Sequence, residues 1–289
     1  MGRRRPRAAG RWRVWGNGLN GLDEASGVRV SVDVSREQKW PDVLWIVRHG
    51  ESAGNVARDA ALKEGLAVID IPLRDVDVPL SALGERQAAA LGRWCEALPL
   101  GERPTIMLSS SYVRARRTAE IVREIGGINP SLVPLVVDER LREKEFGILD
   151  RLTTSGIQER YPAQAEARRL LGKFYHRPPG GESWCDVILR LRSVIDTLTR
   201  EYSHERVLIV CHSVVVLCVR YLLERMTEED ILAIDRAEDV ANCSVTSYQF
   251  DPALGTHGKL ALRLFNHVAP IEDAGERVTK EPDAKTVGG

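Results

Sequence analysis

The chain has 289 residues, enough for one large domain or two small ones, and this length allows a buried core without disulfide bonds. Its composition is 43% hydrophobic and 28% charged, which excludes a chain dominated by disorder. Lys and Arg together number 41, as do Asp and Glu, so the net charge gives no overall bias towards nucleic acid or membranes.

The N-terminal stretch is a local exception to this balance. Residues 1–22 contain six arginines and no acid, with two tryptophans and no helix or strand periodicity. We therefore expect residues 1–38 to form a disordered, Arg-rich extension. Three interpretations stay open: a solvated tail or the product of an upstream start codon, a basic arm that contacts RNA or anionic lipid, and an organelle transit peptide.

The first regular element is a buried strand that ends in a histidine. Apolar residues at 43–47 run directly into Arg48 and His49, and Gly50 allows a sharp turn immediately afterwards. This pattern predicts a histidine at the carboxyl end of a strand. In open α/β sheets, that edge is where ligands bind.

The next elements predict a strand, turn and helix unit of the kind that builds parallel sheets. A short helix is expected near 53–64, and Ser81 is placed to cap a helix at 82–97. A buried strand at 105–109 then leads directly into a helix at 112–125, which stops at two glycines.

The rest of the chain continues the alternation of strands and helices and repeats the histidine pattern. Further predicted elements are a strand at 132–137, one or two short helices within 154–175 interrupted at Pro162, a helix at 183–200, a buried strand at 206–211 that ends before His212, helices at 214–225 and 228–236, and a hairpin at 244–250 and 259–265. We expect one α/β domain at 39–270, a three-layer α/β/α sandwich with a mostly parallel sheet, and a disordered tail at 271–289.

If the strands are parallel neighbours, their polar ends meet at one rim. Arg48 and His49, the run from Ser109 to Arg114, and His212 each follow a strand, and Glu143 lies in a polar stretch after another. Such a cationic pocket with one acid suits a phosphoryl group. A neutral imidazole is a competent nucleophile towards phosphorus, and a carboxylic acid such as Glu143 can protonate the leaving alkoxide.

These residues stand in motifs that resemble the histidine phosphatase superfamily, in the branch of the cofactor-dependent phosphoglycerate mutases, over about residues 42–268. The similar segments are Arg48-His49-Gly50-Glu51-Ser52 with Asn55, Pro79-Leu80-Ser81 to Gly84 with Gln87-Ala88, Ser109 to Ala119, Leu141-Arg142-Glu143 with Gly147, Gly181-Glu182-Ser183, and His212. The resemblance implies a phosphoglycerate mutase-like fold.

The resemblance also implies a role for each matched residue. His49 would be the phosphorylated nucleophile, Glu143 the proton donor and His212 the second histidine. The remaining implied positions are the phosphate ligands Arg48, Arg114 and Asn55, and the substrate-binding residues Ser52, Glu182 and Ser183. Two departures affect the site: Ser213 stands where the family usually has glycine, and Glu145 offers a second acid beside Glu143.

The expected function is phosphomonoester hydrolysis through a phosphohistidine, on a small anionic phosphorylated metabolite. A phosphoglycerate mutase is the alternative, although only 69 positions separate Glu143 from His212, where the mutases usually carry a longer insertion. A phosphate-binding or RNA-contacting module without catalysis is the alternative of another class. An anionic substrate, such as a sugar phosphate or a nucleotide, is suggested by the mostly basic residues Arg151, Arg168, Arg169, Lys173, Tyr175 and Arg177.

No cofactor, metal or membrane partner is expected, and the N-terminal arm is the only hint of a nucleic-acid partner. The five cysteines are odd in number and scattered, without the spacing of a metal site, which predicts a reducing compartment and a cytoplasmic protein. No apolar run reaches the length of about eighteen residues that a membrane span needs. The identity of the substrate and the oligomeric state stay open.

Overall fold

A computed structural model describes residues 37–280, so residues 1–36 of the Arg-rich extension expected at 1–38, and residues 281–289 of the expected tail, lie outside the described chain. The described chain forms a six-stranded sheet with the order β3-β2-β4-β1-β5-β6. Its strands are β1 Val43–Arg48, β2 Ile106–Ser109, β3 Leu135–Val137, β4 Arg206–Cys211, β5 Val245–Asp251 and β6 Lys259–His267. The first four strands are parallel to one another, whereas β5 and β6 form the expected antiparallel hairpin at one edge.

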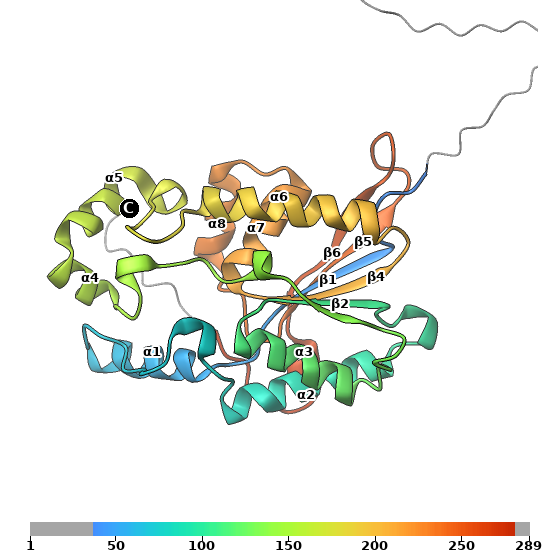
Figure 1. Ribbon diagram of the computed structural model, residues 1–289, viewed down its shortest axis with the longest axis horizontal. Helices are drawn as coiled ribbons and strands as arrows, with labels where there is room; N and C mark the ends of the chain where they lie inside the picture. Colours follow the sequence, from blue (N-terminus) through green and yellow to red (C-terminus); the bar gives the residue numbers. More distant parts are fainter. Residues whose placement is uncertain (1–36, 281–289) are drawn as a thin grey trace, which may run out of the picture. The chain divides into compact units, whose positions relative to one another are not determined.

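Helices cover both faces of the sheet, as Figure 1 shows, with α6, α7 and α8 on one side and α2 and α3 on the other. The helices are α1 Ala53–Glu64, α2 Ala82–Ala97, α3 Val113–Ile125, α4 Thr154–Arg160, α5 Pro162–Tyr175, α6 Trp184–Glu201, α7 Ser213–Glu224, α8 Glu228–Ala237 and α9 Ala269–Glu272. The expected three-layer α/β/α sandwich with a mostly parallel sheet is therefore confirmed.

A separate hydrophobic cluster fills the space on each face of the sheet. One cluster joins residues of β1 and β4 to α6 and α7, and it includes Trp184, Leu191 and Val216. The other joins the opposite faces of these strands to α2 and α3, through Leu91, Ala119 and Val122. Because buried parallel strands are apolar on both faces, they read as unbroken apolar runs in the sequence.

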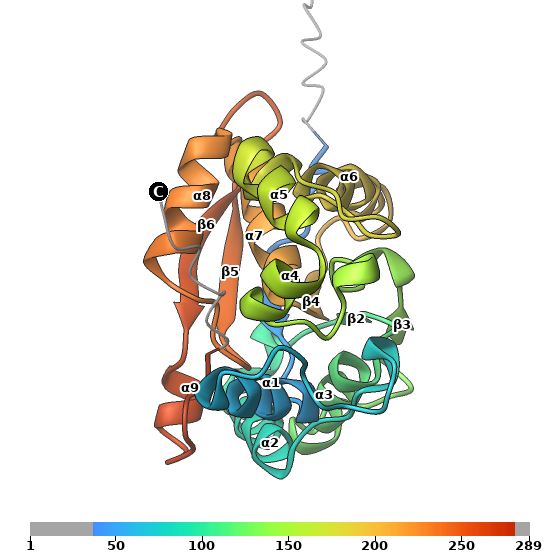
Figure 2. The same cartoon turned by 90° about the vertical axis from the view of Figure 1, so that its left-hand side faces the viewer.

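The strand register aligns the ends that carry polar residues. Arg48 at the end of β1 pairs with Cys211 at the end of β4, and Ser109 at the end of β2 pairs with Val210 of β4. The chain segments that follow these three strands therefore begin at the same edge of the sheet. In Figures 1 and 2, α1, α4 and α5 gather beyond this edge.

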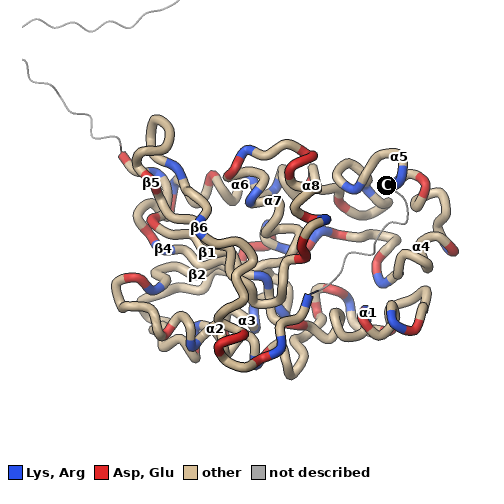
Figure 3. Tube along the Cα trace, turned by 180° about the vertical axis from the view of Figure 1, so that it is seen from behind, with Lys and Arg blue, Asp and Glu red and all other residues tan. Residues whose placement is uncertain are grey.

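Local signals in the sequence explain where several helices begin. The Ser81 hydroxyl accepts a hydrogen bond from the Gly84 amide, as expected for the cap of α2. The predicted break at Pro162 is also confirmed, because proline lacks an amide hydrogen and is tolerated at the first position of α5. Figure 3 shows that the acidic and basic residues of the described chain are interspersed, in keeping with its balanced charge.

The expectation of a disordered tail from residue 271 does not hold for residues 271–280. Ile271 is completely buried, and Val278 packs against the same small cluster beside α2. Thr279 exchanges hydrogen bonds with Gln87 and Asn242. The charged composition of this segment concealed these contacts, because two apolar anchors seven positions apart give no recognisable period.

Candidate active site

His49 lies at the end of β1 with its side chain almost completely buried, and its hydrogen bonds define the protonation state of the ring. Nδ1 lies 2.7 Å from the carbonyl oxygen of Gly50, and Nε2 lies 3.2 Å from Nε of Arg114. A carbonyl oxygen only accepts and a guanidinium only donates, so Nδ1 carries the proton and Nε2 presents a lone pair. The ring is therefore held in the tautomer whose Nε2 has the lone pair that a nucleophile needs.

Gly50 permits this arrangement because the chain passes very close to α2. A side-chain carbon at Gly50 would lie 2.5 Å from the carbonyl oxygen of Gly84, which is too close for any other residue. The Gly50 amide donates to the Thr118 hydroxyl, and the amide of the following Glu51 donates to Gln87. The turn after His49 is thus hydrogen-bonded to both α2 and α3.

Two arginines surround the nucleophilic ring with positive charge. Arg114 lies in the first turn of α3, is 5% exposed, and donates to both carboxylate oxygens of Asp75 at 2.9 and 3.2 Å. Its guanidinium also lies 4.9 Å from the centre of the Tyr112 ring. Arg48 is buried under the site and donates to the carbonyl oxygen of Val240 at 2.6 Å.

His212 meets His49 across the sheet edge, with ring centres 5.1 Å apart. Its Nε2 lies 2.8 Å from the Ser110 hydroxyl. Within the described chain its buried Nδ1 has no hydrogen-bond partner, and the nearest acid is Glu143, with Oε2 at 3.9 Å. The unusual Ser213 begins α7 and lines the cavity, so the departure from glycine leaves His212 in place.

Burial and positive neighbours keep both histidines neutral. Burial lowers the pKa of His49 well below its usual value, and Arg114 and Arg48 lower it further. The pKa of His212 is also well below its usual value, because of burial and then the charges of Arg114, His49 and Arg48. Neutral imidazoles are what a histidine nucleophile requires, since a protonated ring has no free lone pair.

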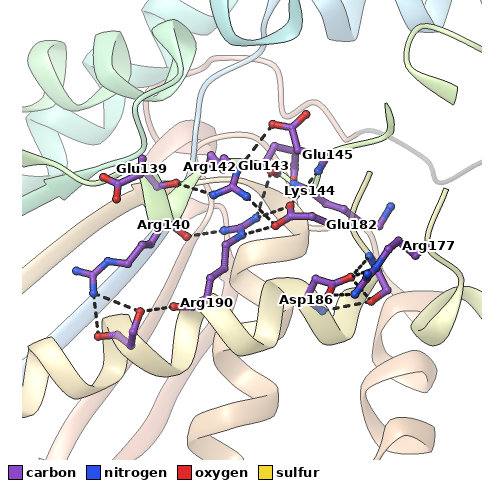
Figure 4. A network of polar contacts seen from close by, with 12 residues as sticks. Glu139, Arg140, Arg142, Glu143, Lys144, Glu145, Arg177, Glu182, Asp186 and Arg190 are labelled. Atoms are coloured by element: carbon purple, nitrogen blue, oxygen red, sulfur yellow. Dashed lines mark hydrogen bonds and ion pairs between the residues drawn. The ribbon is translucent and has the colours of Figure 1, made fainter. Parts of the chain in front are cut away.

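The two candidate acids have different surroundings. Glu143 lines the cavity, and its Oε1 accepts a hydrogen bond from the Lys144 amide at 2.9 Å. Glu145 is not among the residues that line the cavity; its carboxylate accepts from the Tyr112 hydroxyl at 2.8 Å. Both residues are labelled in Figure 4. The geometry therefore favours Glu143 as the acid that meets a bound substrate.

Four residues were expected to contact the substrate, and the structure brings only two of them to the cavity. Ser52 and Asn55 line it at the start of α1, where their side chains hydrogen-bond each other. Glu182 and Ser183 do not line it. The Glu182 carboxylate is held by Arg190 and Arg142, and Ser183 caps α6, so these polar groups are used within the protein (Figure 4).

The cavity around His49 is lined by both apolar and charged residues. The residues that line it include the apolar Leu62, Ile69, Ile71, Leu73, Val78, Leu149, Leu152 and Ile157, the basic Arg58, Lys144, Arg151 and Arg168, and the acidic Asp75, Asp150, Asp235, Glu238 and Asp239. Within residues 37–280, no group of three or more His, Cys, Asp or Glu side chains is placed to hold a metal ion. None of the helices in that range is long and apolar enough to cross a membrane.

The lowered histidine pKa values predict a loss of folding stability in mild acid. In the unfolded chain a histidine titrates near its usual pKa of about 6.5, whereas His212 stays neutral in the folded protein. As the pH falls below that value, the unfolded state takes up a proton that the folded state does not, which costs up to about 1.4 kcal/mol per pH unit.

Between about pH 7 and pH 5.5, the free energy of unfolding should fall in both proteins, and we expect the fall to be about 1 kcal/mol smaller in the His212→Gln variant than in the wild type. Urea unfolding at the two pH values measures the difference. His204, whose side chain is 64% exposed, provides a matched His→Gln control that should follow the wild type. Equal pH slopes for all three proteins would contradict the expectation.

A sequence profile of the histidine phosphatase superfamily, branch 1, matches residues 44–261. The phosphoglycerate mutase-like protein AT74H of Arabidopsis thaliana is 30% identical over 262 residues, which cover 84% of this chain and 84% of that protein. Together with the fold and the strand-end histidines, these matches show that the chain belongs to the histidine phosphatase superfamily.

Two further relatives define how far the likeness extends. The 6-phosphofructo-2-kinase/fructose-2,6-bisphosphatase of Gallus gallus is 32% identical over 190 residues, which cover 65% of this chain and 34% of that protein. The chain thus spans about a third of the length of this relative. The solved structure of YhfR from Bacillus stearothermophilus has a TM-score of 0.61 and 27% identity, and the match covers 79% of this chain and 98% of that one.

Proposed function

We propose that this protein is a phosphomonoester hydrolase that transfers a phosphoryl group from a small anionic metabolite first to His49 and then to water. The observation that carries the proposal is the fixed tautomer of His49. His49 lines the cavity, its Nε2 lone pair accepts a hydrogen bond from Arg114, and the charges of Arg114 and Arg48 act on the ring. Membership of the superfamily supports the same reaction class.

In the first step, Nε2 of His49 forms a bond to phosphorus as the bond from phosphorus to the leaving oxygen breaks. Glu143, in its protonated form, gives its proton to that oxygen, and the product alcohol leaves. In the second step, the Glu143 carboxylate takes a proton from water as the water oxygen attacks phosphorus. The bond from phosphorus to Nε2 then breaks, and His49 returns to its neutral form with inorganic phosphate as the second product.

The transferred group carries negative charge on three equatorial oxygens, which the protein has to stabilise. Arg48 and Arg114 supply positive charge next to Nε2, and Nδ1 of His212 has no other hydrogen-bond partner in the described chain. Asn55 and Ser52 add polar groups at the start of α1. We assign these five side chains to the phosphoryl group; Ser52, Asn55 and Arg114 line the cavity, whereas Arg48 and His212 are buried and are not among its lining residues.

Two basic residues of the cavity lining support a substrate with a second anionic group. Burial and the neighbouring Arg168 lower the pKa of Lys144 to about 8, and the buried Nε of Arg168 has no hydrogen-bond partner in the described chain. Both residues line the cavity, and an anionic ligand would neutralise them. The name of one relative, the 6-phosphofructo-2-kinase/fructose-2,6-bisphosphatase of Gallus gallus, indicates a bisphosphorylated sugar as the substrate of that protein.

Other basic residues that hinted at an anionic substrate have partners within the protein. Lys173 pairs with Asp235, Arg169 with Glu166, and Arg177 with Asp186. None of these three lines the cavity, whereas Arg151 and Arg168 do, so we keep Arg151 and Arg168 as substrate-binding candidates and add Lys144. The five cysteines are all free, which supports the proposal of a reducing, cytoplasmic location.

The alternative is a phosphoglycerate mutase, which the name of the Arabidopsis relative favours. The full chain should release inorganic phosphate from p-nitrophenyl phosphate and from sugar phosphates. It should give little interconversion of 3-phosphoglycerate and 2-phosphoglycerate in the presence of the bisphosphate primer. Mutase turnover faster than phosphate release would replace the hydrolase proposal, whereas absence of both activities would favour a binding module.

A further inference from the structure

The C-terminal residues 276–280, which we call the C-terminal strap, lie beyond the residues that the superfamily profile matches. They follow α9 and run along the side of α2 that faces the turn after His49. Val278 of the strap packs against a buried cluster that includes Ala88 and Cys243. Ion pairs from Glu276 to Arg86 and from Lys280 to Glu238 hold the two ends of the strap.

The hydroxyl of Thr279 is the centre of the polar contacts made by the strap. It accepts a hydrogen bond from Nε2 of Gln87 at 3.0 Å and donates one to Oδ1 of Asn242 at 2.9 Å. The Thr279 carbonyl oxygen also accepts a hydrogen bond from the backbone amide of Asn242 at 2.9 Å. The second hydrogen of the Gln87 amide group goes to the carbonyl oxygen of Arg277 at 2.8 Å.

The opposite ends of these two side-chain amides hold the nucleophile turn. Oε1 of Gln87 accepts from the backbone amide of Glu51 at 2.9 Å. Nδ2 of Asn242 donates to the carbonyl oxygen of His49 at 3.0 Å. Both amide side chains belong to almost fully buried residues, so they meet protein partners in place of water. The strap thus reaches the His49–Glu51 turn through Gln87 at Glu51 and through Asn242 at His49, and Arg277 of the strap also pairs with the Glu51 carboxylate at 3.5 Å.

The contacts of Thr279 favour one orientation of each amide, together with the Arg277 carbonyl in the case of Gln87. A primary amide has a donor end and an acceptor end, and a rotation of about 180° exchanges them. Gln87 must offer its oxygen to the Glu51 amide and Asn242 must offer its nitrogen to the His49 carbonyl. A hydroxyl that accepts from the first and donates to the second favours both orientations at once, and a methyl group in its place can do neither.

We propose that the C-terminal strap positions the nucleophile, with Thr279 as the positioning residue. This inference rests on the proposed function, because it assigns the strap to the alignment of His49 Nε2 for attack on phosphorus. Thr279 itself does not line the cavity, so it acts only through Gln87 and Asn242. Small displacements of a nucleophile are costly, since a misplacement of about 1 Å lowers a rate by about 100-fold.

The test measures formation of the phosphorylated enzyme in a single turnover with p-nitrophenyl phosphate. In the full chain, we expect Thr279→Val to slow this step about 10- to 100-fold with KM within about twofold of the wild type. Thr279→Ser keeps the hydroxyl and should restore most of the rate. The same change at the partly exposed Thr199 of α6, whose hydroxyl donates to the Asp196 carbonyl of its own helix, should leave the rate unchanged.

Thermal unfolding of each variant separates positioning from general stability. The proposal requires the slow step in Thr279→Val at a temperature where the variant is fully folded. It is overturned if the rate stays within about twofold of the wild type, or if it falls only in proportion to the unfolded fraction. Loss of phosphoenzyme formation in the wild type as well would instead refute the proposed function, so the two failures are distinguishable.

Discussion

We expect the His49→Ala variant to release phosphate from p-nitrophenyl phosphate at least about 10⁴-fold more slowly than the wild type, because the change removes the side chain that attacks the substrate in the first step. We expect no other side chain to replace His49 as the nucleophile. The Nε2 lone pair depends on a hydrogen bond to the Gly50 carbonyl that other side chains cannot reproduce. The cavity itself should survive, since the loss of one buried ring leaves the neighbouring strand pairs intact.

The measurement combines turnover with trapping of the intermediate. Wild-type protein quenched during turnover of a ³²P-labelled substrate should carry an acid-labile, base-stable phosphoramidate, and His49→Ala should carry none. His204→Ala serves as the control, because His204 is exposed and has no part in the site. Turnover of His49→Ala near the wild-type rate would show that His49 is not the nucleophile. It would therefore contradict the proposed two-step mechanism.

The effect of Glu143→Gln should depend on the leaving group. The variant keeps the size of the side chain and loses the proton that an alkoxide needs, so kcat for an alkyl phosphate should fall about 10²- to 10⁴-fold. p-Nitrophenolate leaves without protonation, so hydrolysis of p-nitrophenyl phosphate should fall much less in its first step. A comparison of single-turnover rates for the two substrates measures this difference.

Glu145→Gln provides the matched control for Glu143. Its carboxylate accepts from Tyr112 and does not line the cavity, so we expect both single-turnover rates to stay within about threefold of the wild type. The opposite result, with leaving-group sensitivity in Glu145→Gln and none in Glu143→Gln, would transfer the role of acid to Glu145. Loss of both rates equally in Glu143→Gln would indicate a role in binding instead.

The strand-end residues were predictable because their positions follow from sheet geometry. Apolar runs ending in His49 and His212 predict parallel strands with aligned ends, and the register of β1 with β4 confirms this alignment. Helix starts at Ser81 and Pro162 were predictable for a local reason, since caps and prolines act within one turn of the chain.

Contacts between distant segments were not predictable from the same patterns. Asp75 pairs with Arg114 from an irregular connection that has no period to indicate its course. Glu182 matches a family motif beside the substrate, yet its carboxylate meets Arg190 in the next helix. A motif identifies a residue type and a position, but the direction of a side chain depends on which partner folding brings within hydrogen-bond distance.

By itself, the sequence determined the family, the parallel sheet and the identity of the two histidines, because these depend on local periodicity and on short motifs. Only the tertiary structure decided the tautomer of His49, the acid that lines the cavity and the attachment of the C-terminal strap. Each of these depends on a pair of groups far apart in the chain, such as Thr279 and Gln87. Such pairs form only when the whole core is packed, and hydrogen bonds act over about 3 Å.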